Sequence, residues 1–359
     1  MGGGLRAALM PTLSALLTHI GFAGAVFVLS FVLTIAMERG VRIMDLPNER
    51  SSHHRPVPKS GGVAIVTAFV LGCMVIYWVA DVARIEDRHF WGFLGCAIVL
   101  ALVSFVDDVM QRTFLVKAFT QALCTVIVLG TGVVLSLLAF PVIGEMQLGW
   151  TGYAVTFLWM VGLTNAYNFM DGLDGLAGGV TVIAGAFLGG IALSQDSTFV
   201  YMVSYVLLAS TAGFLVMNWS PAKIFMGDVG SAFLGFAFAT LAVIGANLDR
   251  GHLSFYVVPM LLFHFIFDTA FTFFRRLARG EKVYLPHRTH LYQLLNRTGF
   301  SHRAVSLLYC AMTVAQGIGA CVVVIVEPQH KVLVFVPFLL FYAVCAWWIV
   351  QRARGAGVI

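Results

Sequence analysis

The chain has 359 residues and a formal net charge of +5; 60% of its residues are hydrophobic and only 11% are charged. A soluble protein would carry about 25% charged residues, so this composition, with a mean hydropathy of +0.90, excludes a soluble two-domain protein. It predicts an all-α, polytopic membrane protein, because only helices and closed barrels satisfy every backbone polar group in lipid. The six cysteines lie in apolar runs without C-x-x-C spacing, which argues against a zinc or dithiol motif.

Apolar runs close to 20 residues long recur along the whole chain. They predict about eleven transmembrane helices, or ten if one run does not span, in a single domain over residues 1–359. The predicted spans are 15–37, 61–80, 91–106, 118–140, 152–170, 175–194, 199–217, 231–248, 254–274, 305–326 and 332–350. The loops on one side carry 17 of the 22 Lys and Arg residues. Because cytoplasmic loops are rich in these residues, the N-terminus is expected outside and the C-terminus in the cytoplasm.

Five aspartates interrupt the apolar sequence on the predicted cytoplasmic face. Asp107 and Asp108 end the third span. Asp171 and Asp174 lie between the fifth and sixth spans, and Asp228 precedes the eighth. Solvation or helix capping would explain any one of them, and Asp228 alone fits an N-cap. Crowded carboxylates repel one another, however, and Mg²⁺ binds such groups together with substrate phosphates, so the set predicts a metal–phosphate site.

Basic side chains in the loops of the same face are suited to binding phosphates. Loop 45–62 contains Arg50, His53, His54, Arg55 and Lys59. Loop 275–303 contains the sequence Pro-His-Arg-Thr-His, with His287, Arg288 and His290. Attraction to anionic lipid headgroups explains the other basic residues of this second loop, chiefly Arg275, Arg276, Arg279 and Lys282. The loops expected to form the site are 38–60, 107–117, 171–174, 218–230 and 275–304.

Asp268 stands apart, because it lies inside the ninth predicted span. A carboxylate within a membrane is costly and usually functional. A structural ion pair with a nearby Arg explains this residue equally well.

Several sequence stretches together resemble a known family. DLPNERSSHHRPVPKSGG, FVDDV, NAYNFMDGLDGLAGG, FMGDVGS and HRTH occur in the order found in polyprenyl-phosphate N-acetylhexosamine-1-phosphate transferases, and the resemblance covers roughly residues 40–300. These enzymes form glycosyltransferase family 4 and share a superfamily with phospho-N-acetylmuramoyl-pentapeptide transferase. The resemblance implies transfer of a sugar 1-phosphate from a UDP-linked N-acetylated amino sugar to undecaprenyl phosphate, with release of UMP.

The resemblance also implies partners and residue roles. The enzyme would lie in the bacterial inner membrane, in contact with lipid, would bind no nucleic acid, and would use Mg²⁺, for which Mn²⁺ could substitute; a homodimer is compatible with this picture. Asp228 and Asp171 would hold the metal, and Asp107, Asp108 and Asp171 would be the catalytic acids. The substrate-binding residues would be Asn168, His287, Arg288 and His290 near the phosphates and Asp174 with Phe225 at the uracil.

One departure from the family pattern bears on the donor sugar. Many members read H-x-H-H where this chain has His290-Leu291-Tyr292-Gln293. The difference resembles a branch that initiates O-antigen or related surface glycans, often on 6-deoxy amino sugars, and it weakens N-acetylglucosamine as the default donor. It also argues against the pentapeptide transferase, which remains the alternative within the superfamily.

A membrane transporter is the alternative from another class, although transporters place their acids near the bilayer midplane. For the transfer itself we favour direct attack by the lipid phosphate. A phosphate monoester has its second pKa near about 6 and is mostly dianionic at neutral pH. A covalent aspartyl-phosphate intermediate is the competing route.

Overall fold

The computed structural model describes residues 2–41, 43–45, 56–110, 114–283, 285 and 287–359, and Arg50, His53, His54 and Arg55 lie outside these ranges. The first helices are α1 (Gly2–Gly40), α2 (Gly61–Val79), α3 (Asp87–Met110), α4 (Phe114–Gly130), α5 (Thr151–Phe169) and α6 (Leu176–Ser194). They are followed by α7 (Thr198–Asn218), α8 (Gly227–Asn247), α9 (Val257–Leu261), α10 (Phe263–Leu277), α11 (Leu291–Arg297), α12 (His302–Ile325) and α13 (Phe335–Gly355). Short 3₁₀ helices occupy Asp81–Ala83 and Pro328–Val334.

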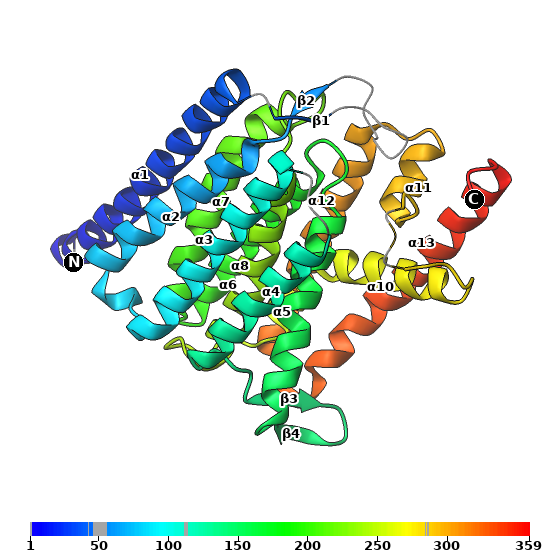
Figure 1. Cartoon of the computed structure of the whole chain (residues 1–359). Coiled ribbons are helices and arrows are strands. Elements are labelled where there is room, and N and C mark those ends of the chain that lie inside the picture. Colours follow the sequence, from blue (N-terminus) through cyan, green and yellow to red (C-terminus); the bar gives the residue numbers. More distant parts are fainter. Residues whose placement is uncertain (1, 42, 46–55, 111–113, 284, 286) are drawn as a thin grey trace.

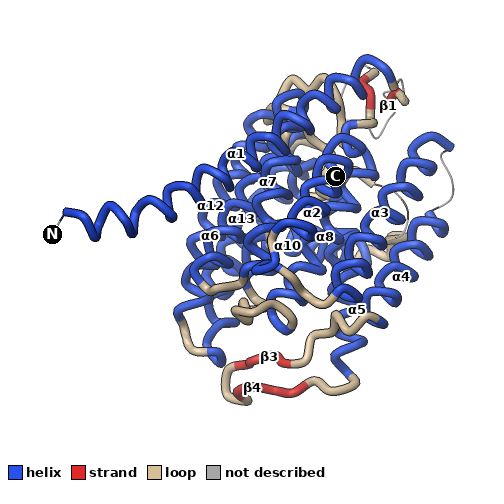
Figure 2. Tube along the Cα trace, turned by 90° about the vertical axis from the view of Figure 1, so that its left-hand side faces the viewer, coloured by secondary structure: helices blue, strands red, loops and turns tan. Residues whose placement is uncertain are grey.

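Two short antiparallel hairpins lie at opposite ends of the helical bundle (Figure 1, Figure 2). In the first, β1 (Met44–Asp45) pairs with β2 (Val57–Pro58), with Met44 opposite Pro58. In the second, β3 (Leu137–Phe140) pairs with β4 (Gly144–Gln147), with Leu137 opposite Gln147. The first hairpin leads directly into α2 and thereby orients the residues that precede this helix.

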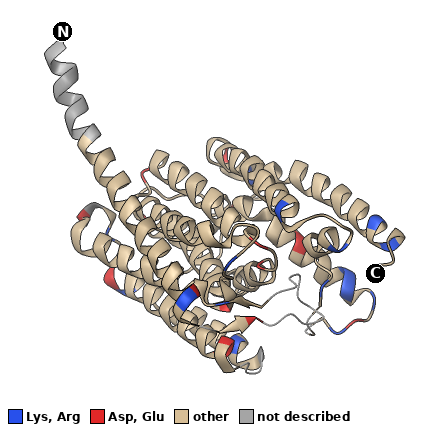
Figure 3. Ribbon diagram, turned by 90° about the horizontal axis from the view of Figure 1, so that it is seen from above, with Lys and Arg blue, Asp and Glu red and all other residues tan. Residues whose placement is uncertain are grey.

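The prediction of a polytopic helical membrane protein is confirmed. Over the described residues, eight helices are long and apolar enough to cross a membrane, and Leu115–Gly130 is a shorter apolar helix. Each predicted span overlaps at least one helix. Charged residues are sparse along the helices, as Figure 3 shows.

Two of the predicted spans differ from the structure. The run 118–140 is not one helix: α4 ends at Gly130, and Leu137–Phe140 form β3. A continuous apolar run does not reveal where a helix gives way to a strand. The run 254–274 is also divided, because α9 ends at Leu261 and α10 begins at Phe263. Figure 1 shows α10 lying across the long direction of the neighbouring helices.

Helix α8 forms the centre of the bundle, where α2, α3 and α5 pack around it. Its small residues permit close approach, as is usual between membrane helices. A Cβ atom on Gly235 would lie 2.7 Å from the Cβ of Tyr167 and 2.9 Å from the Cα of Thr164. This contact fixes the end of α5 beside the start of α8, which is where Asn168 and Asp228 lie.

The starts of α2 and α8 meet backbone to backbone. The amide of Gly61 donates to the carbonyl of Phe225, and the amide of Gly62 donates to that of Met226, both at 2.9 Å. A Cβ atom on Gly62 would lie 2.3 Å from the amide nitrogen of Gly230. The two helix starts therefore form a joint that no larger residue at position 62 would allow.

Candidate active site

A cluster of carboxylates and lysines lies where α3, α4 and α8 meet. Asp107 and Asp108 end α3 and are buried, with 8% and 6% of their surface exposed. Lys117 of α4 forms ion pairs with Asp107, at 2.7 Å between Nζ and Oδ2, and with Asp228 of α8. Lys59 pairs with Asp108, at 3.0 Å between Nζ and Oδ1. Two lysines thus neutralise part of the charge of three clustered carboxylates.

Asn168 holds Asp228 in place from the end of α5. Its side-chain amide donates to Asp228 Oδ1 at 2.8 Å and lies 2.7 Å from the hydroxyl of Ser231. Gly227 precedes Asp228 with a φ of +65°. A Cβ atom there would lie 2.5 Å from the Lys59 carbonyl and 2.8 Å from Asp108 Oδ2. The glycine of the FMGDVGS motif is therefore required both by its backbone conformation and by the approach of the neighbouring carboxylate.

Asp171 lies in the turn between α5 and α6 and is partly buried. Burial raises its pKa, and the negative charges of Asp228 and Asp108 raise it further, to about 8. The effect of these two carboxylates places Asp171 in the same electrostatic environment as the cluster, so the acids of three separate sequence motifs act on one another.

The buried carboxylates have acceptor capacity that the protein does not use. Asp107 Oδ1 and Asp108 Oδ2 are buried and accept no hydrogen bond from the part of the chain that the structure describes. Buried carboxylate oxygens of this kind normally have a partner. Over the described residues, no three His, Cys, Asp or Glu side chains form a group able to hold a metal ion. This donor set fits a cation that takes one or two carboxylates from the protein and its other ligands from substrate and water.

Asp174 lies beside the loop that precedes α8. Its carboxylate pairs with His302 Nδ1 at 3.0 Å and accepts from the amide of Ala222 at 3.1 Å. Burial alone would raise the pKa of Asp174, but these two contacts outweigh it and lower the pKa below the ordinary value. Phe225 belongs to the same loop and is partly buried, and its amide donates to the carbonyl of Pro58 at 2.8 Å. The two residues that the resemblance assigns to uracil therefore border one loop, residues 219–226.

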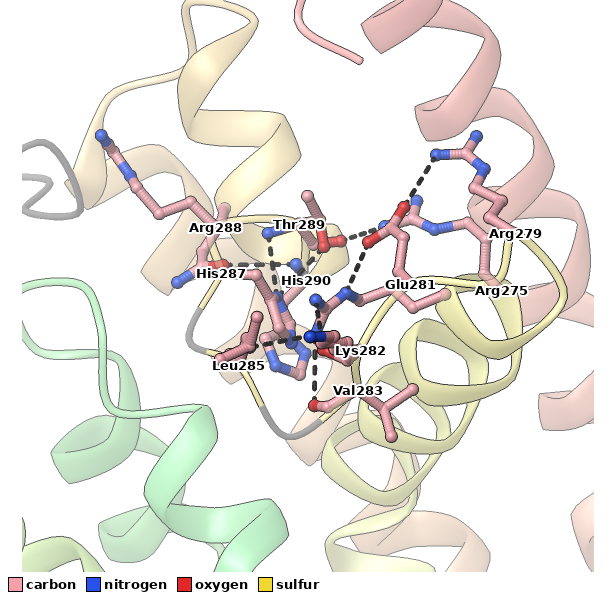
Figure 4. Close-up of polar contacts among 12 residues, drawn as sticks. Arg275, Arg279, Glu281, Lys282, Val283, Leu285, His287, Arg288, Thr289 and His290 are labelled. Carbon is pink, nitrogen blue, oxygen red and sulfur yellow. Dashed lines mark hydrogen bonds and ion pairs between the residues drawn. The ribbon is translucent and has the colours of Figure 1, made fainter. Parts of the chain in front are cut away.

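The loop between α10 and α11 is shaped by Arg276. This side chain is buried, whereas the sequence analysis assigned it to attraction by anionic lipid headgroups. It donates to Glu281 at 2.7 Å. Its other nitrogens donate to the backbone carbonyls of the same loop at 3.0 to 3.2 Å, and Figure 4 shows the surrounding contacts. Arg276 therefore has a structural role, which is to fold the loop that carries the His and Arg residues.

The Pro-His-Arg-Thr-His cluster continues from this loop. His287 contacts the hydroxyl of Thr289 at 3.1 Å and stacks on His290, with 4.8 Å between ring centroids. Burial, His290 and Arg276 lower the pKa of His287 to about 4, so its imidazole is neutral at pH 7. The Arg288 carbonyl accepts from Arg297 at 3.0 Å.

His290 and Tyr292 connect this cluster to α5. The His290 ring stacks on Phe169 at 5.8 Å, and the Tyr292 hydroxyl donates to the Phe169 carbonyl at 2.9 Å. Phe169 directly follows Asn168, the residue that holds Asp228. The structure thus brings the histidine loop against the helix end that carries the acid cluster. Tyr292 also occupies the space that a Cβ atom on Gly172 would need, since only 2.1 Å would separate them.

Sequence analysis missed Lys117 and Ser231 as members of the site. Lys117 is one of few charged residues within an apolar helix, and that isolation is the signal that could have revealed it. A small pocket lies beside it, lined by Lys117, Asn168 and Asp228, by the polar residues Ser104, Thr120 and Gln121, and by the apolar residues Leu100, Val103 and Ala232.

Comparison with known proteins identifies the class to which this fold and site belong. The model of glycosyl transferase family 4 matches residues 90–246. A probable undecaprenyl-phosphate N-acetylglucosaminyl 1-phosphate transferase of Bacillus subtilis (strain 168) is 35% identical over 280 residues, which cover 77% of this chain and 76% of that protein. The chain therefore belongs to the polyprenyl-phosphate N-acetylhexosamine-1-phosphate transferase family, in agreement with the sequence motifs.

Two more distant relatives carry a similar description. The undecaprenyl-phosphate alpha-N-acetylglucosaminyl 1-phosphate transferase of Escherichia coli (strain K12) is 28% identical over 310 residues, covering 84% of this chain and 81% of the relative. A protein of the same description from Yersinia pestis is 27% identical over 331 residues and 87% of each chain. The similarity thus extends well beyond the segment that the family model matches.

Proposed function

We propose that this chain transfers a sugar 1-phosphate from a UDP-N-acetylhexosamine to undecaprenyl phosphate, releases UMP, and thereby initiates a cell-surface glycan. The observation that carries the proposal is the convergence of Asp107, Asp108, Asp171 and Asp228 with two lysines at the ends of α3, α5 and α8. The names of the relatives support the acceptor and the reaction class. The excess of Lys and Arg in the loops of the same face supports a site on the cytoplasmic side of the bacterial inner membrane.

A divalent cation, Mg²⁺ or Mn²⁺, fits this site. Asp228 and Asp171 would hold it, because their carboxylates act on each other and belong to the two motifs that the family resemblance assigns to the metal. When bound, it would neutralise the diphosphate of the donor and polarise the phosphorus under attack. The buried, unsatisfied oxygens of Asp107 and Asp108 supply further negative charge that a cation would balance.

The reaction exchanges one phosphoanhydride for another and needs no further reactant. An oxygen of the lipid phosphate attacks the β-phosphorus of the donor, the bond from that phosphorus to the bridging oxygen breaks, and UMP leaves with the electron pair. Lys59 and Lys117 would reduce the repulsion between the two polyanions, as cationic side chains do in other phosphoryl transfers. Asn168 keeps Asp228 oriented. His287, Arg288 and His290 would bind the phosphates from the other side of α5.

Asp174 and Phe225 would recognise the uracil. A carboxylate has about four lone-pair sites, so the contacts of Asp174 with His302 and Ala222 leave capacity for the imide N–H of the base. The family relatives favour N-acetylglucosamine as the sugar, whereas the Tyr292-Gln293 departure favours another amino sugar. We therefore propose the class, a UDP-N-acetylhexosamine or its 6-deoxy analogue, and leave the individual sugar to the assay.

An exchange assay on the purified, detergent-solubilised protein tests the proposal. Labelled UMP is incubated with undecaprenyl phosphate, Mg²⁺ and one UDP-sugar at a time, with UDP-N-acetylglucosamine, UDP-N-acetylgalactosamine and a 6-deoxy analogue as donors. We expect label to return into one UDP-sugar, with loss of exchange in EDTA and recovery in Mn²⁺. Omission of the lipid phosphate is the matched control.

The outcomes separate the mechanisms. Exchange that needs the lipid supports direct attack, whereas exchange without lipid indicates a covalent aspartyl-phosphate. Absence of exchange with every donor, from protein that melts cooperatively, would refute the proposed function.

A further inference from the structure

Asp268 of α10 is a buried carboxylate at the centre of a hydrogen-bond network. Only 1% of its surface is exposed. On Oδ1 it accepts from His290 Nδ1 at 3.1 Å, the Leu291 amide at 2.9 Å and the Thr272 hydroxyl at 3.1 Å. On Oδ2 it accepts from the Tyr292 amide at 3.2 Å and the Tyr309 hydroxyl at 3.1 Å. Five donors around one carboxylate satisfy it fully, which accounts for a charged group in an apolar surrounding.

The arginines near Asp268 do not explain its presence. Arg276 donates to Glu281 and to loop carbonyls, and Arg275 donates to the carbonyl of Thr289. Each arginine thus has a hydrogen-bond partner elsewhere in the loop. The carboxylate of Asp268 instead contacts His290, which lies 22 residues further along the chain.

This pairing fixes both the orientation and the proton of His290. A carboxylate only accepts, so Nδ1 of His290 is the donor in this contact and Nε2 is the ring nitrogen left for another partner. The backbone amide of His290 donates to Gln293 at 3.2 Å, and its ring lies against His287 and Phe169. Nε2 is therefore the atom that His290 can offer to a ligand, and the ring has little freedom to turn.

Hydrogen bonds through Tyr292 connect Asp268 to the helix end that lies beside the acid cluster. Asp268 accepts from the amide of Tyr292, whose hydroxyl donates to the carbonyl of Phe169. Phe169 and Asn168 are adjacent residues at the end of α5, and the Asn168 side chain donates to Asp228. One carboxylate on α10 thereby sets the position of α11 relative to the end of α5.

We propose that Asp268 is a positioning residue for phosphate binding, which acts by fixing the tautomer and the orientation of His290. The inference rests on the proposed function, because it assumes that His290 contacts a substrate phosphate. It resembles the carboxylates that orient metal-binding histidines, whose removal typically costs about 10- to 100-fold in affinity or activity. It also gives this intramembrane acid a functional role in place of a purely structural ion pair.

The first test is spectroscopic and needs no substrate. The protein is labelled with ¹⁵N-histidine in detergent, and the signal of His290 is identified by its loss in His290→Gln. We expect a protonated Nδ1 in the wild type. Asp268→Asn replaces one of the two accepting oxygens by an amide donor, so we expect the share of His290 with a protonated Nδ1 to fall. An unprotonated Nδ1 in the wild type would overturn the inference, even if Asp268→Asn did not fold.

The second test is a double-mutant cycle on the transfer rate. Asp268→Asn and His290→Gln should each lower kcat/KM about 10- to 100-fold, and the double variant should be no worse than His290→Gln. Tyr309→Phe is the matched control, since it removes one donor to the same carboxylate and leaves the His290 contact; it should keep near-normal turnover. Additive losses, or an equal loss in Tyr309→Phe, would assign Asp268 to structure alone. If the wild type catalyses no exchange, the proposed function fails, while the spectroscopic test still decides the Asp268–His290 pairing.

Discussion

Replacing Lys117 with Met tests the electrostatics of the acid cluster most directly. The Lys117 ammonium lies between Asp107 and Asp228, and the methionine keeps a similar length without the charge. The side chains of Lys117 and Asp228 are 26% and 31% exposed, and the side chain of Asp107 is 10% exposed. Removal of the charge leaves these two carboxylates with less compensation, in a setting that is neither fully buried nor fully solvated.

The burial sets the expected size of the effect. Breaking a fully buried ion pair costs about 3–5 kcal/mol, whereas exposed pairs contribute about 0–1 kcal/mol. An intermediate value of about 2 kcal/mol lowers the melting temperature by about 3 °C in a protein of this size. The affinity of the site for a cation, in contrast, should increase. With the competing ammonium gone, the apparent affinity for Mg²⁺ should rise about tenfold or more, since about 1.4 kcal/mol corresponds to a factor of ten.

Thermal melting of the detergent-solubilised protein, with and without a Mg²⁺ titration, measures both effects. Lys331→Met is the control, because Lys331 lies in the 3₁₀ helix before α13 and takes no part in the cluster. That variant should respond to Mg²⁺ as the wild type does. A Lys117→Met protein with unchanged melting temperature and unchanged Mg²⁺ response would refute the idea that lysine and cation balance the same carboxylates.

Three further predictions concern the other groups of the site. Asp228→Asn should lower the exchange rate at least about 100-fold in protein that melts normally, since it removes a proposed cation ligand; near-normal exchange would remove Asp228 from that role. Asp174→Ala should weaken UMP binding about tenfold or more in calorimetry, because hydrogen bonds to charged groups contribute about 1.5–3 kcal/mol, with little change for the lipid. In the folded protein the pKa of His287 is lowered from 6.5 to about 4. The unfolded chain therefore binds this proton at a higher pH than the folded chain does, and the stability of the fold falls as the pH drops from about 6.5 toward 4. Acid unfolding should lose part of this slope in His287→Asn, and an unchanged slope would contradict the lowered pKa.

The acid cluster could be predicted because its members are exceptional in their sequence context. A doublet, a D-x-x-D and a G-D-x-G in an apolar chain each require an explanation, and helix ends on one face bring them together. The structure accordingly surrounds Lys117 with Asp107 and Asp228. Lys117 itself escaped notice because we counted it with the positive charges of a cytoplasmic loop, which orientation in the membrane already explains.

Other features could not be predicted, because the sequence signal is ambiguous. Hydropathy is equally high in the last turns of α4 and in β3, so it predicts one long span across both. The partner of Asp268 also could not be predicted from the sequence. Arg275 and Arg276 are near it in sequence, while His290 approaches only because α10 and the following loop fold back on each other.

The backbone contact between Gly62 and Gly230 bears on how the protein responds to the surrounding bilayer. Helices that are joined only by side chains tilt and slide when the hydrocarbon thickness changes, and such mismatch costs fractions of a kcal/mol per Å. The starts of α2 and α8 are instead held by two backbone hydrogen bonds at van der Waals contact. A change in acyl-chain length would therefore be absorbed at the far ends of these helices, while the spacing between Lys59 and Asp228 stays the same in thin and thick membranes.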